Sequence, residues 1–117
     1  MQMHEFSEEG AVILTVEGRL DTAAANEFES RLLALIDGGA RRLCIDCGDL
    51  TYLNSSALRG FLVAAQRMRA VGGKLAISDL SDTTRKIFEV IGFTKIITIV
   101  PKRDDALRHL AAEPVTT

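Results

Sequence analysis

The chain has 117 residues, of which 47% are hydrophobic and 26% charged, a composition typical of one folded globular domain rather than of a disordered chain. Its formal net charge of −2 at pH 7 argues against a protein held to nucleic acid or anionic lipid by overall charge. The sequence contains no apolar run near the roughly 18–20 residues that cross a bilayer, and it begins without a secretory signal pattern. We therefore expect a cytoplasmic domain over residues 1–112, without membrane insertion, followed by a loose tail at 113–117.

The first half of the chain alternates strands and helices. A short strand near 3–7 and a strand at 11–16 come first, joined by a turn at 8–10. Asp21 or Thr22 then caps a helix. The apolar residues of one face of that helix are Phe28, Leu32, Leu35 and Ile36. Two glycines at 38–39 end the helix, and a strand at 42–47 follows.

A second helix is predicted after Asn54 and Ser55, and glycines at 72–73 end it. Its expected core stripe is Leu58, Phe61, Leu62, Ala65 and Met68. A strand at 74–78 comes next.

The last part of the chain repeats this alternation. Ser81 or Asp82 caps a third helix, which ends at Gly92. The residues expected to pack on the core from this helix are Ile87, Val90 and Ile91. A strand at 95–100 is followed by a final helix that starts at Asp104 or Asp105 and carries Leu107 and Leu110.

Strand and helix alternating at this spacing is typical of βαβ units, in which the strands run parallel and helices cover the sheet. The strands are almost entirely apolar, as expected for a sheet covered on both faces. The predicted fold class is α/β.

Few side chains suggest catalysis or metal binding. Cys44 and Cys47 form a CxxC, but in a strand residues three apart point to opposite faces, so the two thiols cannot converge. His4 and His109 stand alone, and no phosphate-binding glycine motif occurs. We therefore predict no catalytic residue, no metal site and no cofactor.

The segment 49–58 joins the carboxyl end of a strand to the amino end of a helix. Ligand sites in parallel sheets lie beyond the carboxyl ends of the strands, and a helix start favours an anion. A serine in that first turn could carry a phosphate. Ordinary helix capping explains Asn54, Ser55 and Ser56 equally well, and Asp21 too, so the spacing leaves both interpretations open.

Three stretches together resemble STAS domains, most closely the small stand-alone anti-sigma factor antagonists of bacteria. They are GRLD, DLTYLNSSALRGFL and GGKLAISDLSDTTRKIFEVIGFTKIITIV, and the resemblance extends from about residue 12 to 110. The resemblance implies a mixed sheet of four or five strands flanked by about four helices.

In that family the segment reads Asp-Leu-x-x-Leu/Met-Asp-Ser-Ser/Ala-Gly, and a partner kinase phosphorylates the serine that follows the acid. Ser55 falls on this phosphoacceptor position, with Ser56 beside it, and Asp21 falls on an acid that lies near the loop. Asn54 and Ala57 stand where the family usually has Asp and Gly. Asparagine keeps the capping ability of the acid but removes its charge.

The resemblance implies a regulatory protein, not an enzyme. Its unphosphorylated form would dock on an ATP-binding, kinase-like anti-sigma factor, and phosphorylation of Ser55 would break the complex. We expect the docking surface to comprise the Ser55 loop and the outer face of the second helix. The residues of that face follow at i, i+4, i+7 and i+11: Arg59, Val63, Gln66 and Ala70.

Other functions stay open. The same fold serves as a cytoplasmic STAS subunit of a lipid-transport ATPase complex, or as a docking module that is never phosphorylated. A second copy of the chain, in a weak homodimer, is a further candidate partner. A phospho-receiver is less consistent with the sequence. The acidic pair that would hold magnesium in a receiver is missing from residues 15–18, at the end of the strand that starts at 11.

Overall fold

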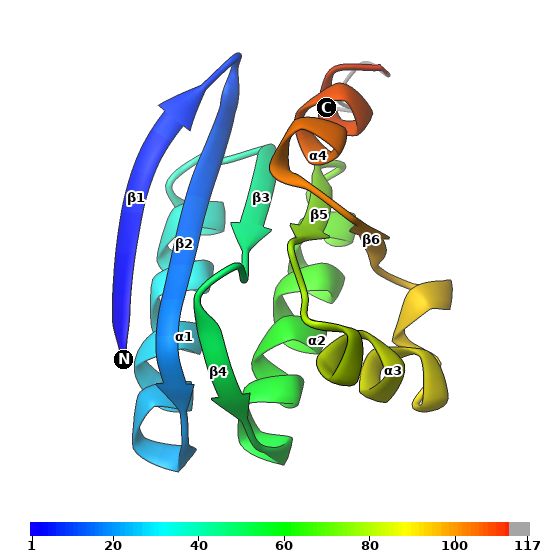
Figure 1. Ribbon diagram of the computed structural model, residues 1–117. Coiled ribbons are helices and arrows are strands. Elements are labelled where there is room, and N and C mark those ends of the chain that lie inside the picture. Colours follow the sequence, from blue (N-terminus) through cyan, green and yellow to red (C-terminus); the bar gives the residue numbers. More distant parts are fainter. Residues whose placement is uncertain (113–117) are drawn as a thin grey trace.

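The computed structural model describes residues 1–112 as a mixed six-stranded sheet with four α-helices, which confirms the predicted α/β class (Figure 1). The tail predicted at 113–117 lies outside the described residues. The elements are β1 (Gln2–Glu8), β2 (Ala11–Leu20), α1 (Thr22–Asp37), β3 (Arg42–Asp46), β4 (Leu50–Leu53), α2 (Ser55–Ala70), β5 (Lys74–Ser78), α3 (Asp82–Val90), the 3₁₀ helix η1 (Phe93–Lys95), β6 (Thr98–Val100) and α4 (Arg103–Ala112).

The strands are ordered β1-β2-β3-β5-β6, with β1 antiparallel to β2 and the other pairs parallel. The ten-residue strand β2 pairs with β3 along its first half and with β4 along its second half. The register of the second pairing shifts between Gly18 and Arg19. The four-residue strand β4 was not among the elements expected from the sequence, because so short a run becomes a strand only through its long-range partner.

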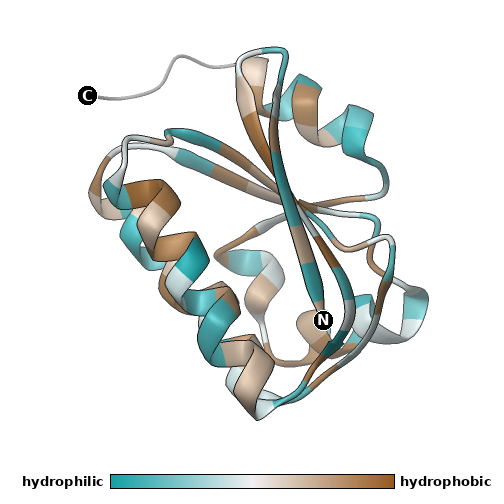
Figure 2. Ribbon diagram, turned by 90° about the vertical axis from the view of Figure 1, so that its left-hand side faces the viewer, coloured by the Kyte–Doolittle hydropathy of each residue, from teal (hydrophilic) through white to brown (hydrophobic). Residues whose placement is uncertain are grey.

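Each face of the sheet has its own hydrophobic cluster. Figure 2, viewed from the β1 side, shows α1 and α4 on opposite sides of the sheet. Cys47 belongs to the large cluster under α1 and α2, whereas Cys44 belongs to the smaller cluster under α4. The two thiols therefore point to opposite faces, as the strand period predicts.

The third helix buries a different residue from those expected. Phe88 is fully buried, and its ring lies 5.3 Å from that of Phe61. Ile87, Val90 and Ile91, which were predicted to pack on the core, are instead 39%, 86% and 46% exposed. That prediction was wrong because it followed the side of the helix with more apolar residues. Three aliphatic residues lie on that side, whereas the side that meets the core carries a single phenylalanine.

The strand expected at 95–100 begins only at Thr98. Gly92 adopts φ +84°, a left-handed conformation that favours glycine, and the chain then makes the 3₁₀ turn η1 before it enters the sheet. Ile97 is buried there, whereas Ile96 is 45% exposed.

Helices α1 and α2 pack closely, and this contact positions the candidate site. The buried residues of α2 are Ala57, Gly60, Phe61, Ala64 and Met68, so Phe61 and Met68 of the expected stripe are confirmed, while Leu58, Leu62 and Ala65 are only partly buried. A Cβ on Gly60 would lie 3.3 Å from Cδ2 of Phe28 in α1. The bare glycine thus lets the two helices approach.

Candidate site at the amino termini of α1 and α2

The amino termini of α1 and α2 are linked by their capping residues. Asp21 Oδ1 accepts a hydrogen bond from the backbone N–H of Ala24 at 3.0 Å, and Asn54 Oδ1 accepts one from that of Ala57 at 3.2 Å. Each bond satisfies a backbone donor that has no partner within its own helix. Asn54 Nδ2 also donates to Thr22 Oγ1 at 3.0 Å, which joins the two helix starts.

The backbone leading to Ser55 is held to β2. Gly18 N–H donates to the carbonyl of Asp49 at 2.9 Å, and Asn54 N–H donates to the carbonyl of Leu20 at 3.3 Å. Ser55 is the first residue of α2 and is exposed, whereas Ser56 is partly buried. Within residues 1–112 the Ser55 side chain makes no hydrogen bond. The structure therefore presents this hydroxyl to solvent on a fixed backbone.

The electrostatics at this position suit an added negative charge. The first turn of α2 contains no acidic residue, and the helix dipole places a partial positive charge there. Arg19 lies with its guanidinium carbon 4.1 Å from the centre of the Tyr52 ring in β4. This cation–π pair joins β2 to β4, the strand that leads to Asn54 and Ser55.

Sequence reasoning missed Thr22 as the partner of Asn54, and it missed the pairing of Arg19 with Tyr52. Both contacts depend on the β2–β4 pairing and on the packing of α1 beside α2, so no local sequence pattern predicts them. Only the positions of Arg19 and Thr22 on either side of the Leu20–Asp21 pair of GRLD could have drawn attention to them.

The residues predicted to form the docking face share one side of α2. Arg59, Gln66 and Ala70 are exposed and Val63 is partly buried. Arg67, one turn from Val63, is bound to Asp37 of α1 with an Nη1–Oδ1 distance of 2.7 Å. That ion pair fixes the far end of the two helices in the same way that Asn54 and Thr22 fix the near end.

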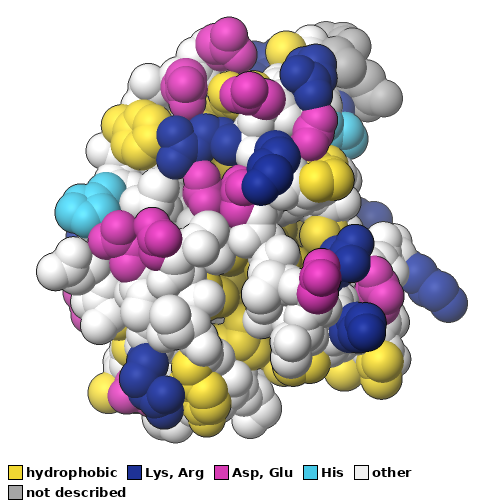
Figure 3. Space-filling model, in the orientation of Figure 1, with side chains coloured by type: hydrophobic (Ala, Val, Ile, Leu, Met, Phe, Trp, Pro, Cys, Tyr) yellow, Lys and Arg dark blue, Asp and Glu magenta, His cyan; other side chains and the backbone are white. Residues whose placement is uncertain are grey.

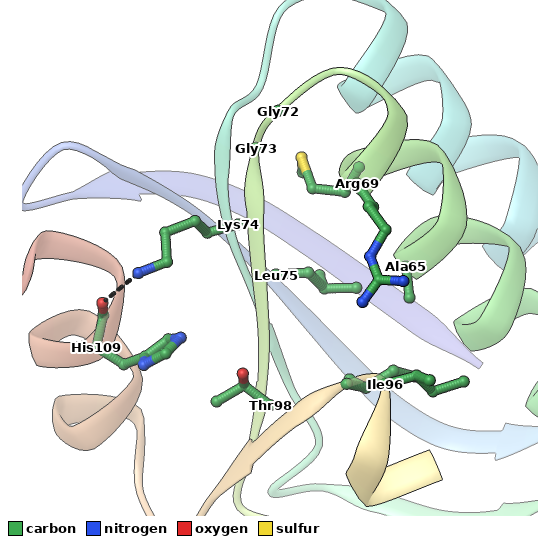
Figure 4. A pocket seen from close by; sticks show the side chains of 11 residues that line it. Ala65, Arg69, Gly72, Gly73, Lys74, Leu75, Ile96, Thr98 and His109 are labelled. Carbon is green, nitrogen blue, oxygen red and sulfur yellow. Dashed lines mark hydrogen bonds between the residues drawn. The ribbon is translucent and has the colours of Figure 1, made fainter. Parts of the chain in front are cut away.

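A hollow of about 300 Å³ lies at the other end of α2, beside β5, β6 and α4 (Figure 4). Figure 4 shows Arg69 and His109 on opposite sides of it, and Lys74 Nζ donates to the carbonyl of His109 at 3.2 Å. Arg69 lies in the last turn of α2 and His109 in the last turn of α4, and a basic side chain such as Arg69 at a helix carboxyl end stabilises the helix dipole.

A second charged group lies near the β1–β2 turn, where Figure 3 shows acidic and basic side chains intermingled in the upper part of the face. Arg103 Nε donates to Asp46 Oδ2 at 2.8 Å, and its Nη1 lies 3.7 Å from Glu8 Oε2. Burial alone would lower the pKa of Arg103, but the hydrogen bond to Asp46 and the negative charges of Asp46 and Glu8 together outweigh burial and raise that pKa. The group ties α4 to β1 and β3.

Neither cysteine resembles a reactive thiol. Burial raises the pKa of Cys44 to about 11 and raises that of Cys47 as well. In the described part of the chain, no group of three or more His, Cys, Asp or Glu residues could hold a metal ion. None of the helices within residues 1–112 combines the length and apolar character needed to cross a membrane.

Comparison with known proteins identifies the family. The family model of the STAS domain matches residues 7–106. One relative is the protein BtrV of Bordetella bronchiseptica, whose name describes it as an anti-sigma factor antagonist. It is 35% identical to this chain over 98 residues, which cover 84% of each chain.

Solved structures share the fold. An anti-sigma factor antagonist from Mycobacterium paratuberculosis superimposes with a TM-score of 0.85 at 21% identity, over 93% of this chain and 92% of the other. The Bacillus cell fate determinant SpoIIAA in its phosphorylated form gives a TM-score of 0.72 at 18% identity, over 92% and 98%. With the family model matching most of its length, the chain belongs to the STAS domain family.

Proposed function

We propose that this STAS protein is an anti-sigma factor antagonist, a regulatory protein without catalytic activity that acts by binding another protein. The observation that carries the proposal is the exposed Ser55 at the first position of α2, with its hydroxyl free and the backbone that leads to it fixed by bonds to β2 and by the Asn54 cap. The name of the relative from Bordetella bronchiseptica supports the same function. The proposed domain comprises residues 1–112 and acts in the cytoplasm.

The partner in this proposal is a kinase-like anti-sigma factor. The unphosphorylated protein docks through the Ser55 loop and the outer face of α2, with Arg59, Val63 and Gln66 in contact. The partner then transfers the γ-phosphoryl group of ATP to Ser55. A bond forms between Oγ and phosphorus, the β–γ anhydride bond breaks, ADP leaves and the serine proton passes to a base on the partner or to water.

The phosphate acts at the interface rather than on the fold. It adds about −1.5 to −2 charge at neutral pH, and the start of α2 accepts this charge because the helix dipole favours it. Against a docked surface the same charge is repelled and must lose its water. Asp21 and Asn54 hold the two helix starts in place and do not receive the phosphate.

Affinity capture from the native cell extract, followed by mass spectrometry of the partners and of Ser55, tests the proposal. We expect a protein with an ATP-binding kinase domain among the partners and a fraction of Ser55 carrying phosphate. Capture of permease and ATPase subunits with unmodified Ser55 would instead support a transport-complex subunit. A Ser55→Asp bait provides the control, because it should lose the kinase-like partner.

A further inference from the structure

Four of the six large exposed hydrophobic side chains of the described residues lie between residues 87 and 96. Ile87, Val90, Ile91 and Ile96 are 39%, 86%, 46% and 45% exposed. Residues 87, 90 and 91 follow at i, i+3 and i+4, so they share one flank of α3. Exposed apolar side chains grouped in this way usually mark a site of interaction.

The packing of α3 leaves this flank uncovered. Phe88 points into the core, and the charged residues Asp82, Arg85 and Glu89 line a hollow beside β6. Arg85 pairs with both acids, at 3.2 Å to Asp82 and 3.9 Å to Glu89. The core and β6 therefore cover two sides of α3, whereas Ile87, Val90 and Ile91 lie on a third side.

Ile96, the fourth of these exposed side chains, lies against α2. Ile96 and four residues of α2 surround a groove of about 100 Å³. The α2 residues are Leu62, Ala65, Gln66 and Arg69. Gln66 also belongs to the outer face of α2 that we propose as the docking face, so the groove adjoins that face directly. Phe61 of α2 packs on Phe88 of α3, and the two helices lie side by side in Figure 1.

The charge around this surface is positive although the chain as a whole is acidic. Helix α2 contains three arginines and no acid, the two acids of α3 are matched by Arg85 and Lys86, and η1 adds Lys95. These elements therefore carry a formal charge of four positive units, or three once Arg67 is set against its partner Asp37 in α1, whereas the whole chain carries −2. An acidic partner would be attracted to this surface and a basic one repelled.

From these observations we infer that the docking surface extends from α2 across the Ile96 groove onto the apolar flank of α3, and that the partner covers it with apolar side chains flanked by carboxylates. The occupant is the anti-sigma factor of the proposed function, on which this inference rests. An aliphatic side chain of that partner fits the Ile96 groove, and its carboxylates face Arg69 and Lys95.

Binding of the captured anti-sigma factor to purified variants of the full chain, measured by isothermal titration calorimetry, tests this inference. Val90→Asp should raise the dissociation constant at least tenfold, and Val90→Lys should raise it clearly less, because a cation remains compatible with an acidic partner. Ile96→Asp should also weaken binding. Phe6→Asp on β1, where the native side chain is 40% exposed, is the matched control and should change binding less than twofold.

Thermal denaturation of each variant excludes unfolding as the cause, since Val90 is 86% exposed and its replacement should leave the melting temperature unchanged. Equal binding of wild type, Val90→Asp and Ile96→Asp would overturn the inference but not the proposed function. Wild type that fails to bind the anti-sigma factor would overturn both. Self-association of wild type that Val90→Asp abolishes, seen by analytical ultracentrifugation, would assign this surface to a second copy and also overturn the inference.

Discussion

Asn54 Nδ2 donates to Thr22 Oγ1 at 3.0 Å, so the residue that caps α2 also holds the start of α1. One amide thus satisfies a backbone donor of its own helix and joins the helix to its neighbour. The arrangement places the two positive helix ends together, beside the exposed Ser55.

Asn54→Ala should lower the free energy of unfolding by about 1–2 kcal/mol, because it removes both the cap and the bond to Thr22. Urea denaturation of the purified protein measures this loss. Thr22→Val is the matched control: it removes only the bond between the helices and should cost less. Unchanged stability of Asn54→Ala would show that the cap contributes nothing.

Ser55, not Ser56, is the expected phosphoacceptor, since Ser55 is exposed at the first position of α2 and Ser56 is partly buried. The cognate kinase should transfer labelled phosphate to wild type and to Ser56→Ala, but not to Ser55→Ala. Label retained on Ser55→Ala would refute the assignment.

Ser55→Asp should weaken binding of the anti-sigma factor at least tenfold while the melting temperature stays nearly constant. The helix dipole tolerates the new carboxylate, whereas the docked surface does not. Ser55→Asn separates charge from size and should bind more tightly than Ser55→Asp. A marked fall in the melting temperature of Ser55→Asp would contradict the exposed placement of the side chain.

Asn54→Asp should be phosphorylated faster than wild type if a carboxylate at this position helps to orient the kinase or polarise the hydroxyl. The substitution is a clean test because an aspartate can still cap α2, and the Thr22 hydroxyl can donate to its carboxylate in place of the bond that the asparagine amide donates. Rates for the two proteins, measured with one cognate kinase, decide the question. Equal rates would leave Asn54 as a cap alone.

The two thiols should resist alkylation in the folded protein at pH 8 and react once it is unfolded in urea. Burial raises the pKa of Cys44 from 9.0 to about 11, so the unfolded thiol ionises first as the pH rises. The free energy of unfolding should therefore decrease between pH 9 and 11. Iodoacetamide labelling followed by mass spectrometry measures the reactivity. Rapid labelling of native Cys44 would show that its strand opens.

The sequence predicts those elements whose ends carry local signals. Asp21, Asn54 and Ser81 cap their helices, and each was among the candidate caps that the sequence offered at that position. It does not predict β4, because Leu50–Leu53 becomes a strand only beside the far half of β2. The prediction for α3 failed for a related reason: periodicity counts apolar residues and cannot tell a flank that meets the core from one that stays exposed.

The same distinction applies to the candidate site. The resemblance and the helix start together single out Asp21, Asn54 and Ser55 from the sequence. The link to Thr22 and the stacking of Arg19 on Tyr52 arise from strand pairing and helix packing. The residue types of Arg19, Thr22 and Tyr52 do not by themselves indicate these contacts.

The attachment of β4 to β2 also bears on how a kinase can recognise Ser55. Strand β4 ends one residue before the cap of α2, and the residues on either side of it, Asp49 and Asn54, are hydrogen-bonded to Gly18 and Leu20 of β2. The serine is thus not on a pliable segment that an enzyme could draw out as a linear peptide substrate. A kinase must bring its active site to a rigid, three-dimensional surface, so its choice of substrate depends on the folded domain more than on the residues that flank the serine.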